Sequence, residues 1–223
     1  DSVTSAGRNN ELAYQVAKSA KELKRDMETA LLTNIAKAAG SATAARKLAG
    51  APTWFETNVD AGTGGSGAGN GAIRTDGTQR AFTESQLKGV LVKCYNQGGN
   101  PNMIMVNAFN KQKLSGFTGG STRFDAAEDR RLITSIDVYE SDFGTMQVAP
   151  NRFIRGANGT AAKIGQDAHI LDMEYWAVSF LRDFSLQTPA QTSDADQRFM
   201  VAEYTLESRN EKASGLITDL TTS

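Results

Sequence analysis

The first third of the chain carries a helical pattern of apolar and polar positions. Apolar side chains recur in steps of three and four residues, which places them on one face of a helix. The residues of this apolar stripe are Leu12, Val16, Ala20, Leu23, Met27, Leu31 and Ile35. Asn9 or Asn10 can cap the start of the helix, and residues 38–40 can end it. The pattern therefore predicts one helix of about 30 residues, from Asn9 to Ala39, roughly 45 Å long.

The opposite face of the predicted helix is charged. Its charged residues are Lys18, Lys21, Glu22, Lys24, Arg25 and Glu28. A solvated surface is the simpler interpretation of such a face, and contacts with a neighbouring subunit are the alternative.

From Gly40 to about Gly77 the helical pattern stops, and the chain is predicted to be a loop that is rich in glycine. Three of the glycines, Gly62, Gly64 and Gly67, have the G-x-G-x-x-G spacing of a dinucleotide-binding turn. No strand is predicted before them, however, and the next predicted helix begins well after them. We therefore interpret the stretch as a flexible loop and not as a cofactor site.

A helix–strand–helix unit follows the loop. Thr83 and Gln86 form a capping-box pair at the start of the second helix, and residues 98–99 are glycines that end it. One face of that helix is formed by Leu87, Val90, Leu91 and Cys94. Asn102–Val106 predicts a buried strand, because residues 103–106 are apolar on both faces, and Asn107 then caps a third helix.

The rest of the chain has the pattern of strands. Leu132–Glu140 and Thr145–Ala149 predict a pair of short strands. Met173–Phe184 and Arg198–Ser208 predict a long hairpin, because the second segment alternates apolar and polar residues with a period of two. Residues 216–217 suggest a short closing strand. Helices followed by strands in this order predict an α+β fold.

The residues Asp142, Phe143 and Gly144 spell the metal-binding triplet of protein kinases. The other kinase motifs are absent from the sequence. Between two predicted strands, an Asp-x-Gly segment indicates a turn.

The composition excludes several classes of protein. The 24 basic and 25 acidic side chains give a net charge of -1, so the chain has no basic field for holding nucleic acid by phosphate neutralisation. No stretch approaches the roughly 18 consecutive apolar residues of a membrane span. Residues 1–8 are polar where a signal peptide would be apolar, and the first residue is Asp1. We therefore expect a soluble, non-secreted chain that is a fragment lacking an N-terminal part.

Candidate catalytic chemistry is sparse. The sequence has one cysteine, Cys94, and one histidine, His169, which cannot form a disulfide or supply a zinc site unaided. Cys94 lies on the apolar face of the second predicted helix, where a packed and inert thiol is usual. His169 is interpreted as a residue at the start of a strand. We expect no cofactor, no metal and no enzymatic activity.

The order of these elements resembles the Hong Kong 97-type major capsid protein of tailed bacteriophages. That order is a long helix, a glycine-rich excursion, the helix–strand–helix unit from Thr83 to Asn107, a long β hairpin and a final strand. Several segments are also similar in amino-acid sequence to a podovirus-like major head protein family within that fold. These segments are Gly7–Tyr14, Lys21–Glu28, Ala45–Gly50 and Met173–Trp176. The resemblance covers nearly all of the chain except residues 62–77, which are similar to a variable loop.

The resemblance implies a division of the chain into four parts. Residues 1–39 would hold the spine helix of a peripheral domain, and residues 40–172 would form an axial domain that contains the glycine-rich loop 62–77. Residues 173–208 would be the long hairpin of the peripheral domain, and residues 209–223 a return strand to the axial domain. The family has an N-terminal arm and an extended loop before the spine helix, and we expect both to belong to the part that this fragment lacks.

The resemblance also implies a function. The chain would self-assemble into the hexamers and pentamers of an icosahedral phage head, assembled in the host cytoplasm, that encloses double-stranded DNA through non-specific contact. Portal, scaffolding and cementing proteins are possible partners, and no membrane is involved. A two-stranded ribbon is marginal alone in water, so neighbouring subunits are expected to cover the hairpin. The expected interface residues are Lys21, Arg25, Glu28, Trp176, Phe180 and Tyr204.

Two alternatives stay open from the sequence. An encapsulin-like compartment protein shares the fold but encloses enzymes, so the cargo distinguishes it from a virus. An enzyme that uses Cys94 and His169 is the less favoured alternative. Imaging of the purified assembly separates either shell from such an enzyme.

Overall fold

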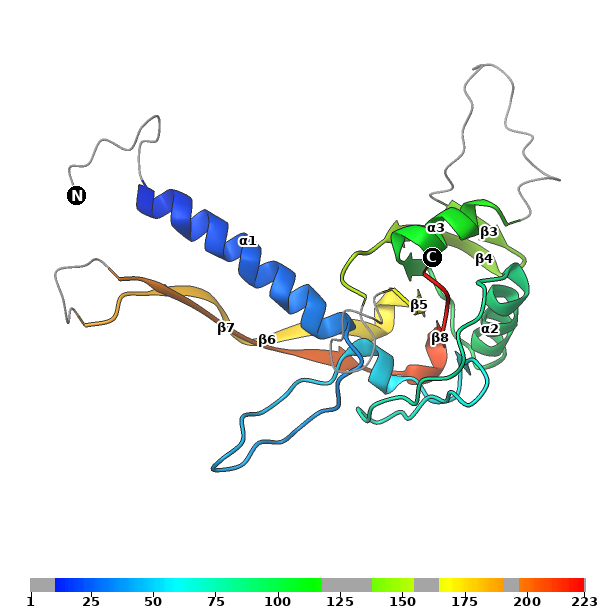
Figure 1. The fold of residues 1–223 in the computed structure, drawn as a ribbon, viewed down its shortest axis with the longest axis horizontal. Coiled ribbons are helices and arrows are strands. Elements are labelled where there is room, and N and C mark those ends of the chain that lie inside the picture. The colour runs from blue at the N-terminus through cyan, green and yellow to red at the C-terminus, as the bar shows by residue number, and fades with distance from the viewer. Residues whose placement is uncertain (1–10, 118–137, 155–164, 191–196, 223) are drawn as a thin grey trace, which may run out of the picture. The chain divides into compact units, whose positions relative to one another are not determined.

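The computed structural model describes residues 11–117, 138–154, 165–190 and 197–222. The chain divides into two compact units (Figure 1). The helix–hairpin unit comprises Asp1–Glu28 and Val178–Thr205, and the sheet unit comprises Thr29–Ala177 and Leu206–Ser223.

The helix–hairpin unit is built from three long elements, whose ends continue into the sheet unit. They are the helix α1 (Glu11–Leu32) and the strands β6 (Trp176–Gln187) and β7 (Phe199–Ser208). The two strands form a two-stranded sheet, so the predicted long hairpin is confirmed. Strand β6 begins three residues later than predicted because residues 173–175 form a 3-10 turn. The side chain of Asp172 caps that turn by accepting a hydrogen bond from the Glu174 N–H.

The first helix is shorter than predicted. It spans 22 residues and ends at Leu32, not at Ala39. Beyond it, the side chain of Asn34 bonds both backbone groups of Arg74, accepting from the N–H at 3.1 Å and donating to the carbonyl at 3.3 Å. These bonds hold residue 34 in a loop pairing with a segment 40 residues away, so the local helical pattern beyond Leu32 is overridden.

The sheet unit contains a mixed six-stranded sheet in the order β1-β8-β5-β2-β4-β3. Its strands are β1 (Val59–Asp60), β2 (Met103–Val106), β3 (Val138–Ser141), β4 (Gly144–Pro150), β5 (Ala168–Leu171) and β8 (Gly215–Ile217). The pairs β1/β8 and β2/β4 are parallel, and the other pairs are antiparallel. The predicted α+β class is therefore confirmed. The predicted closing strand lies inside the sheet, between β1 and β5. Strand β1 was not expected, whereas β5 contains His169, which was interpreted as a residue at the start of a strand.

Local signals placed the helices of the sheet unit well. Helix α2 (Glu84–Asn96) begins with the predicted capping box, and Gly98 follows its end with a φ of +82°. The side chain of Asn107 caps α3 (Ala108–Ser115), as predicted. Asp142 and Phe143 of the Asp-Phe-Gly triplet form the tight turn between β3 and β4, and Gly144 begins β4 with a φ of +142°. Of the strand predicted at Leu132–Glu140, residues 132–137 lie outside the described part of the chain.

The two faces of the sheet have different cores. On one face, the apolar side of α2 packs against side chains that alternate along the strands, including Ile104, Ile170 and Ile217. On the other face, Phe55, Leu171 and Leu216 form a smaller cluster, and the partly buried side chains of β1 and β2 pack against it. The period of two in each strand explains this separation, because successive side chains point to opposite faces.

The glycine-rich stretch is a loop, as predicted, but it is a packed loop. Backbone bonds of 3.0 and 3.1 Å join Ser66 and Thr75 in both directions. A methyl group on Gly62 would lie 2.1 Å from the carbonyl oxygen of Thr78, and one on Gly77 would lie 2.5 Å from that of Gly62. The glycines therefore allow backbones to approach closely, and the flexibility expected from them is not their role here.

Candidate functional site

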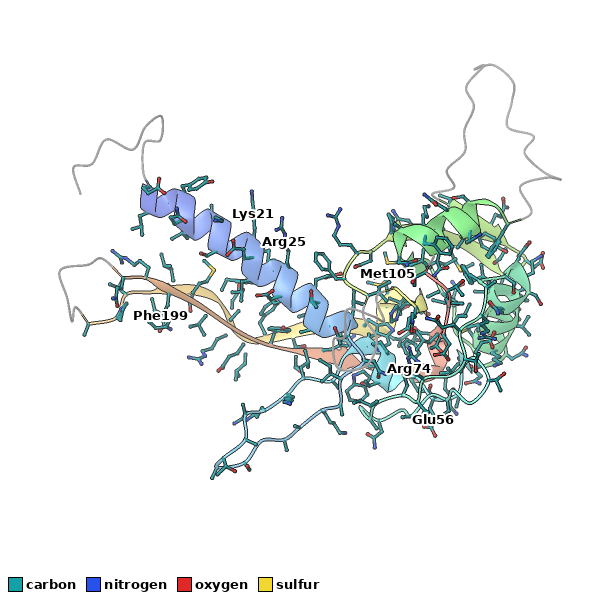
Figure 2. The ribbon with its side chains drawn as sticks, in the orientation of Figure 1. Lys21, Arg25, Glu56, Arg74, Met105 and Phe199 are labelled. Carbon is teal, nitrogen blue, oxygen red and sulfur yellow. The ribbon has the colours of Figure 1, made fainter. Side chains whose placement is uncertain are left out.

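The charged face of α1 carries three of the six residues expected at an interface. Lys21 and Arg25 are exposed on the helix (Figure 2), and Glu28 is half-buried. On the opposite face, the predicted apolar stripe is only half-covered: Leu23 is partly buried and Leu12 is 38% exposed. Within the described part of the helix–hairpin unit, Met27 is the one side chain that is buried.

The hairpin carries a row of aromatic rings. The ring of Phe180 lies 5.9 Å from that of Phe184 and 6.3 Å from that of Tyr204, measured between centroids. The ammonium of Lys24 lies 5.7 Å from the centre of the Phe184 ring, which places α1 beside this row. Partial burial, together with the negative charge of Asp26, raises the pKa of Tyr204. The expected interface residues Phe180 and Tyr204 are thus brought together.

The hairpin nevertheless leaves much of its apolar surface in water. Its exposed large apolar side chains are Val178 at 39%, Phe180 at 43%, Leu181 at 80%, Leu186 at 48% and Phe199 at 44%. By the period of two, Val178, Phe180 and Leu186 share one face of β6 and Leu181 lies on the other, so both faces of the hairpin expose large apolar side chains. We call these five residues the exposed apolar ribbon.

An ion pair joins the two strands of the hairpin. The Arg182 guanidinium donates to both carboxylate oxygens of Glu203, at 2.9 and 2.5 Å. The two bonds give the pair a bidentate geometry across the hairpin, although the exposure of both side chains keeps its contribution to stability small.

Trp176 has a different environment from the other expected interface residues. It belongs to the sheet unit, where its ring lies 5.5 Å from that of Phe55. Its indole N–H donates to the hydroxyl of Ser214 at 3.0 Å. The side chain is therefore half-buried against its own chain.

A buried ionic cluster in the sheet unit was missed by the sequence analysis. Arg74 has no exposed side-chain surface and lies within the sheet unit (Figure 2). Its guanidinium lies 2.8 Å from Asp76, 2.7 Å from Asp167 and 3.3 Å from Asp219. These contacts join the glycine-rich loop to the start of β5 and to the end of the chain. No local pattern could reveal them, because two of the partners are 93 and 145 residues away.

The two fully buried carboxylates of the cluster differ in their pKa. Burial raises the pKa of Asp167 to about 6, against the opposing charge of Arg74, and one of its oxygens has no hydrogen-bond partner. Burial acts in the same direction on Asp219, but the N–H groups of Gly77 and Gly62 and the Thr218 hydroxyl bond its carboxylate and lower its pKa overall. The cluster therefore holds one well-satisfied carboxylate and one poorly satisfied carboxylate.

Cys94 and His169 do not form a dyad. Cys94 is buried on the apolar face of α2, where burial raises the pKa of its thiol to about 12. His169 pairs with Leu216 in the sheet and lies beside Phe55, so its side chain belongs to the opposite face of the sheet from Cys94. Burial, together with the charge of Arg74, lowers the pKa of His169 to about 3. A neutral imidazole separated from the thiol by the sheet cannot activate it. The interpretation of His169 as a residue near the start of a strand is confirmed.

Among the described residues, no group of three or more His, Cys, Asp or Glu side chains is placed to hold a metal ion. No helix in the described ranges combines the length and apolar character that crossing a membrane requires.

The structure thus combines a packed sheet unit, in which Cys94 and His169 lie apart, with a helix–hairpin unit that exposes large apolar side chains. The sequence matches the model of the family described as SU10 major capsid protein over residues 1–221. The chain belongs to the SU10 major capsid protein family. No curated relative matches the chain.

Membership of this family decides the broad function. The SU10-family protein is a bacteriophage major capsid protein, a structural protein of the virion that forms an oligomeric shell. The phage capsid is therefore favoured over an encapsulin-like compartment and over an enzyme that uses Cys94 and His169.

Proposed function

We propose that this SU10-family capsid protein has the Hong Kong 97-type fold of a podovirus-like head protein and assembles into the hexamers and pentamers of an icosahedral head. In this proposal α1 is the spine helix, residues 40–172 form the axial domain, and β6 and β7 form the peripheral hairpin. Residues 209–223, which include β8, return to the axial sheet. The order of these elements along the chain supports the assignment.

The exposed apolar ribbon is the observation that carries the proposal. A large apolar side chain gains about 1.5–3 kcal/mol when it passes from full exposure to full burial. Leu181 is 80% exposed, and the other four ribbon residues are between 39% and 48% exposed. Covering them at every subunit contact would therefore stabilise a shell through the repetition of one modest interface.

The charged face of α1 completes the proposed contact. Lys21, Arg25 and Glu28 would meet neighbouring subunits, together with Phe180 and Tyr204 on the hairpin. Trp176 would contribute through the part of its ring that the sheet unit leaves uncovered. The net charge of -1 suits a head that holds double-stranded DNA by confinement, because an inner wall with strong phosphate binding would hinder packaging and release. Assembly would take place in the host cytoplasm, with portal, scaffolding and cementing proteins as further partners.

The test replaces Leu181 in the full-length protein. We expect Leu181→Asp to abolish particles, because it places a charge in a contact that excludes water, and to leave the melting temperature of the subunit unchanged. The matched control, Leu181→Met, retains an apolar side chain of similar volume and should assemble. Electron microscopy and sedimentation velocity measure particle yield. Normal particles from the aspartate variant would show that the ribbon lies outside the subunit contacts.

A further inference from the structure

Residues 37–47 form a narrow hairpin that projects from the sheet unit (Figure 1). Every residue in this range is exposed. Its base is tied to the unit by two backbone bonds, from the Lys37 N–H to the Gly71 carbonyl and from the Gly50 N–H to the Ile35 carbonyl. We call residues 37–47 the basic arm, because their charged side chains are two lysines and one arginine.

The basic arm has a defined conformation despite its exposure. Ala38 and Lys47 exchange two backbone hydrogen bonds of 3.0 Å. At the tip, the hydroxyl oxygen of Ser41 accepts from the N–H of Ala44 at 3.1 Å. Gly40 adopts a φ of +83°, and a methyl group there would lie 2.8 Å from Cγ of Arg46. A segment that is already shaped loses little conformational entropy when it docks, which favours binding.

The side chains of the basic arm are small enough to allow close contact with another chain. Apart from the charged residues, it consists of alanine, glycine, serine and threonine. Small side chains leave the backbone N–H and carbonyl groups accessible, so another chain can approach the edge of the hairpin. Beyond its base at Lys37, every residue of the arm remains exposed, so its outer part is available to a partner.

The charge of the basic arm is opposite to that of the rest of the chain. Residues 29–55 contain three basic and no acidic side chains, which leaves 21 basic and 25 acidic side chains elsewhere. Lys37 is held at the base, where its ammonium donates to the Asn70 side chain and lies 5.7 Å from the centre of the Trp54 ring. Within the described part of the chain, Arg46 and Lys47 take part in no ion pair. They are therefore the two cations that the arm presents outward.

We propose that the basic arm docks onto an acidic surface of a second copy of this chain and so links neighbouring subunits of the shell. The proposal rests on the proposed function, because it requires many copies to assemble. DNA binding gains affinity from the number of phosphates that a protein neutralises, and each one contributes about -0.9 to the slope of log K against log salt concentration. Two outward cations neutralise only about two phosphates, so they make a weak site for DNA. Two cations on a preshaped, small-residue hairpin suit a net-acidic protein surface better.

The first test measures the accessibility of the arm. Ala44→Cys places a thiol near the tip, and the native Cys94 is buried and unreactive. A maleimide should label the new thiol about tenfold more slowly in DNA-free particles than in dissociated subunits, the ratio for a contact worth about 1.4 kcal/mol. Equal labelling rates in the two states would overturn the proposal. Protection only in DNA-filled particles would also overturn it, in favour of DNA as the partner.

The second test reverses the charge of the arm. Arg46→Glu combined with Lys47→Glu should cause a loss of particles while the melting temperature of the subunit stays unchanged, because both side chains are exposed. The control, Arg46→Lys combined with Lys47→Arg, retains both charges and should assemble. Normal assembly of the double glutamate variant would overturn the proposal and leave the proposed function intact. Failure of the unsubstituted protein to form any particles would instead overturn the proposed function and this inference with it.

Discussion

Replacement of Arg74 by methionine tests whether the buried ionic cluster holds the sheet unit together. Methionine fills a similar volume without charge, so it leaves the carboxylates of Asp167 and Asp219 buried without a counter-charge. Removing one partner of a buried ion pair costs about 3–5 kcal/mol of unfolding free energy. We expect a cost in that range near neutral pH.

The expected cost depends on pH because Asp167 titrates. In the native protein the pKa of Asp167 is about 6, so near pH 5 this carboxyl is mostly protonated and has little need of Arg74. Above about pH 6 Asp167 ionises in the unsubstituted protein, where Arg74 balances its charge. In the folded variant without Arg74 the Asp167 carboxyl stays protonated, although it is ionised in the unfolded chain, so the folded variant loses stability as the pH rises. This loss amounts to about 1.36 kcal/mol for each pH unit above about 6, or about 2 kcal/mol at pH 7.5. The destabilisation by Arg74→Met should therefore be about 2 kcal/mol smaller near pH 5 than near pH 7.5.

Urea unfolding of unassembled subunits at the two pH values measures both effects. Tryptophan fluorescence reports on the right unit, because Trp54 and Trp176 both belong to the sheet unit. The matched control is Arg80→Met, because Arg80 pairs with Asp60 where both side chains are 27% exposed, and that loss should cost about 1 kcal/mol or less. If Arg74→Met costs no more than Arg80→Met, or if its cost is the same at both pH values, the account of the cluster is wrong.

Two further predictions concern the same unit. The unfolding free energy of the unsubstituted subunit should fall by roughly 3 kcal/mol as the pH rises from about 4 to about 6, because in this window Asp167 keeps its proton in the native state and releases it in the unfolded state. Asp167→Asn should remove this pH dependence in urea titrations. An unchanged pH dependence would assign it to another group. Gly89→Ala should stabilise the subunit by about 0.5–1 kcal/mol, because alanine is the better helix former and no atom lies near the added methyl group. Gly77→Ala should destabilise the subunit by about 1–3 kcal/mol, because its methyl group would collide with the backbone of Gly62. Equal melting temperatures for the two glycine variants would contradict the close packing of the loop.

Much of the local structure was determined by short-range chemistry that the sequence displays directly. The capping box at Thr83 and the cap at Asn107 act across three residues, so both helix starts could be placed without a fold. The alternation in Arg198–Ser208 likewise predicted a strand, because its period of two does not depend on which strand pairs with it. Phe180 and Tyr204, which the same hairpin argument proposed as interface residues, lie together in the structure.

Only the tertiary structure decided the features that join distant segments. Asn34 ended α1 early by bonding to the backbone of Arg74, and β8 entered the sheet between β1 and β5. Arg74 pairs with Asp167 and Asp219, which lie 93 and 145 residues away in the sequence. The sheet places Cys94 and His169 on opposite faces. Periodicity and capping act within about one helical turn, whereas these contacts depend on how strands pair across the whole chain. That difference in range is why the sequence alone showed glycines and single charges where the folded chain has a packed loop and a buried ionic cluster.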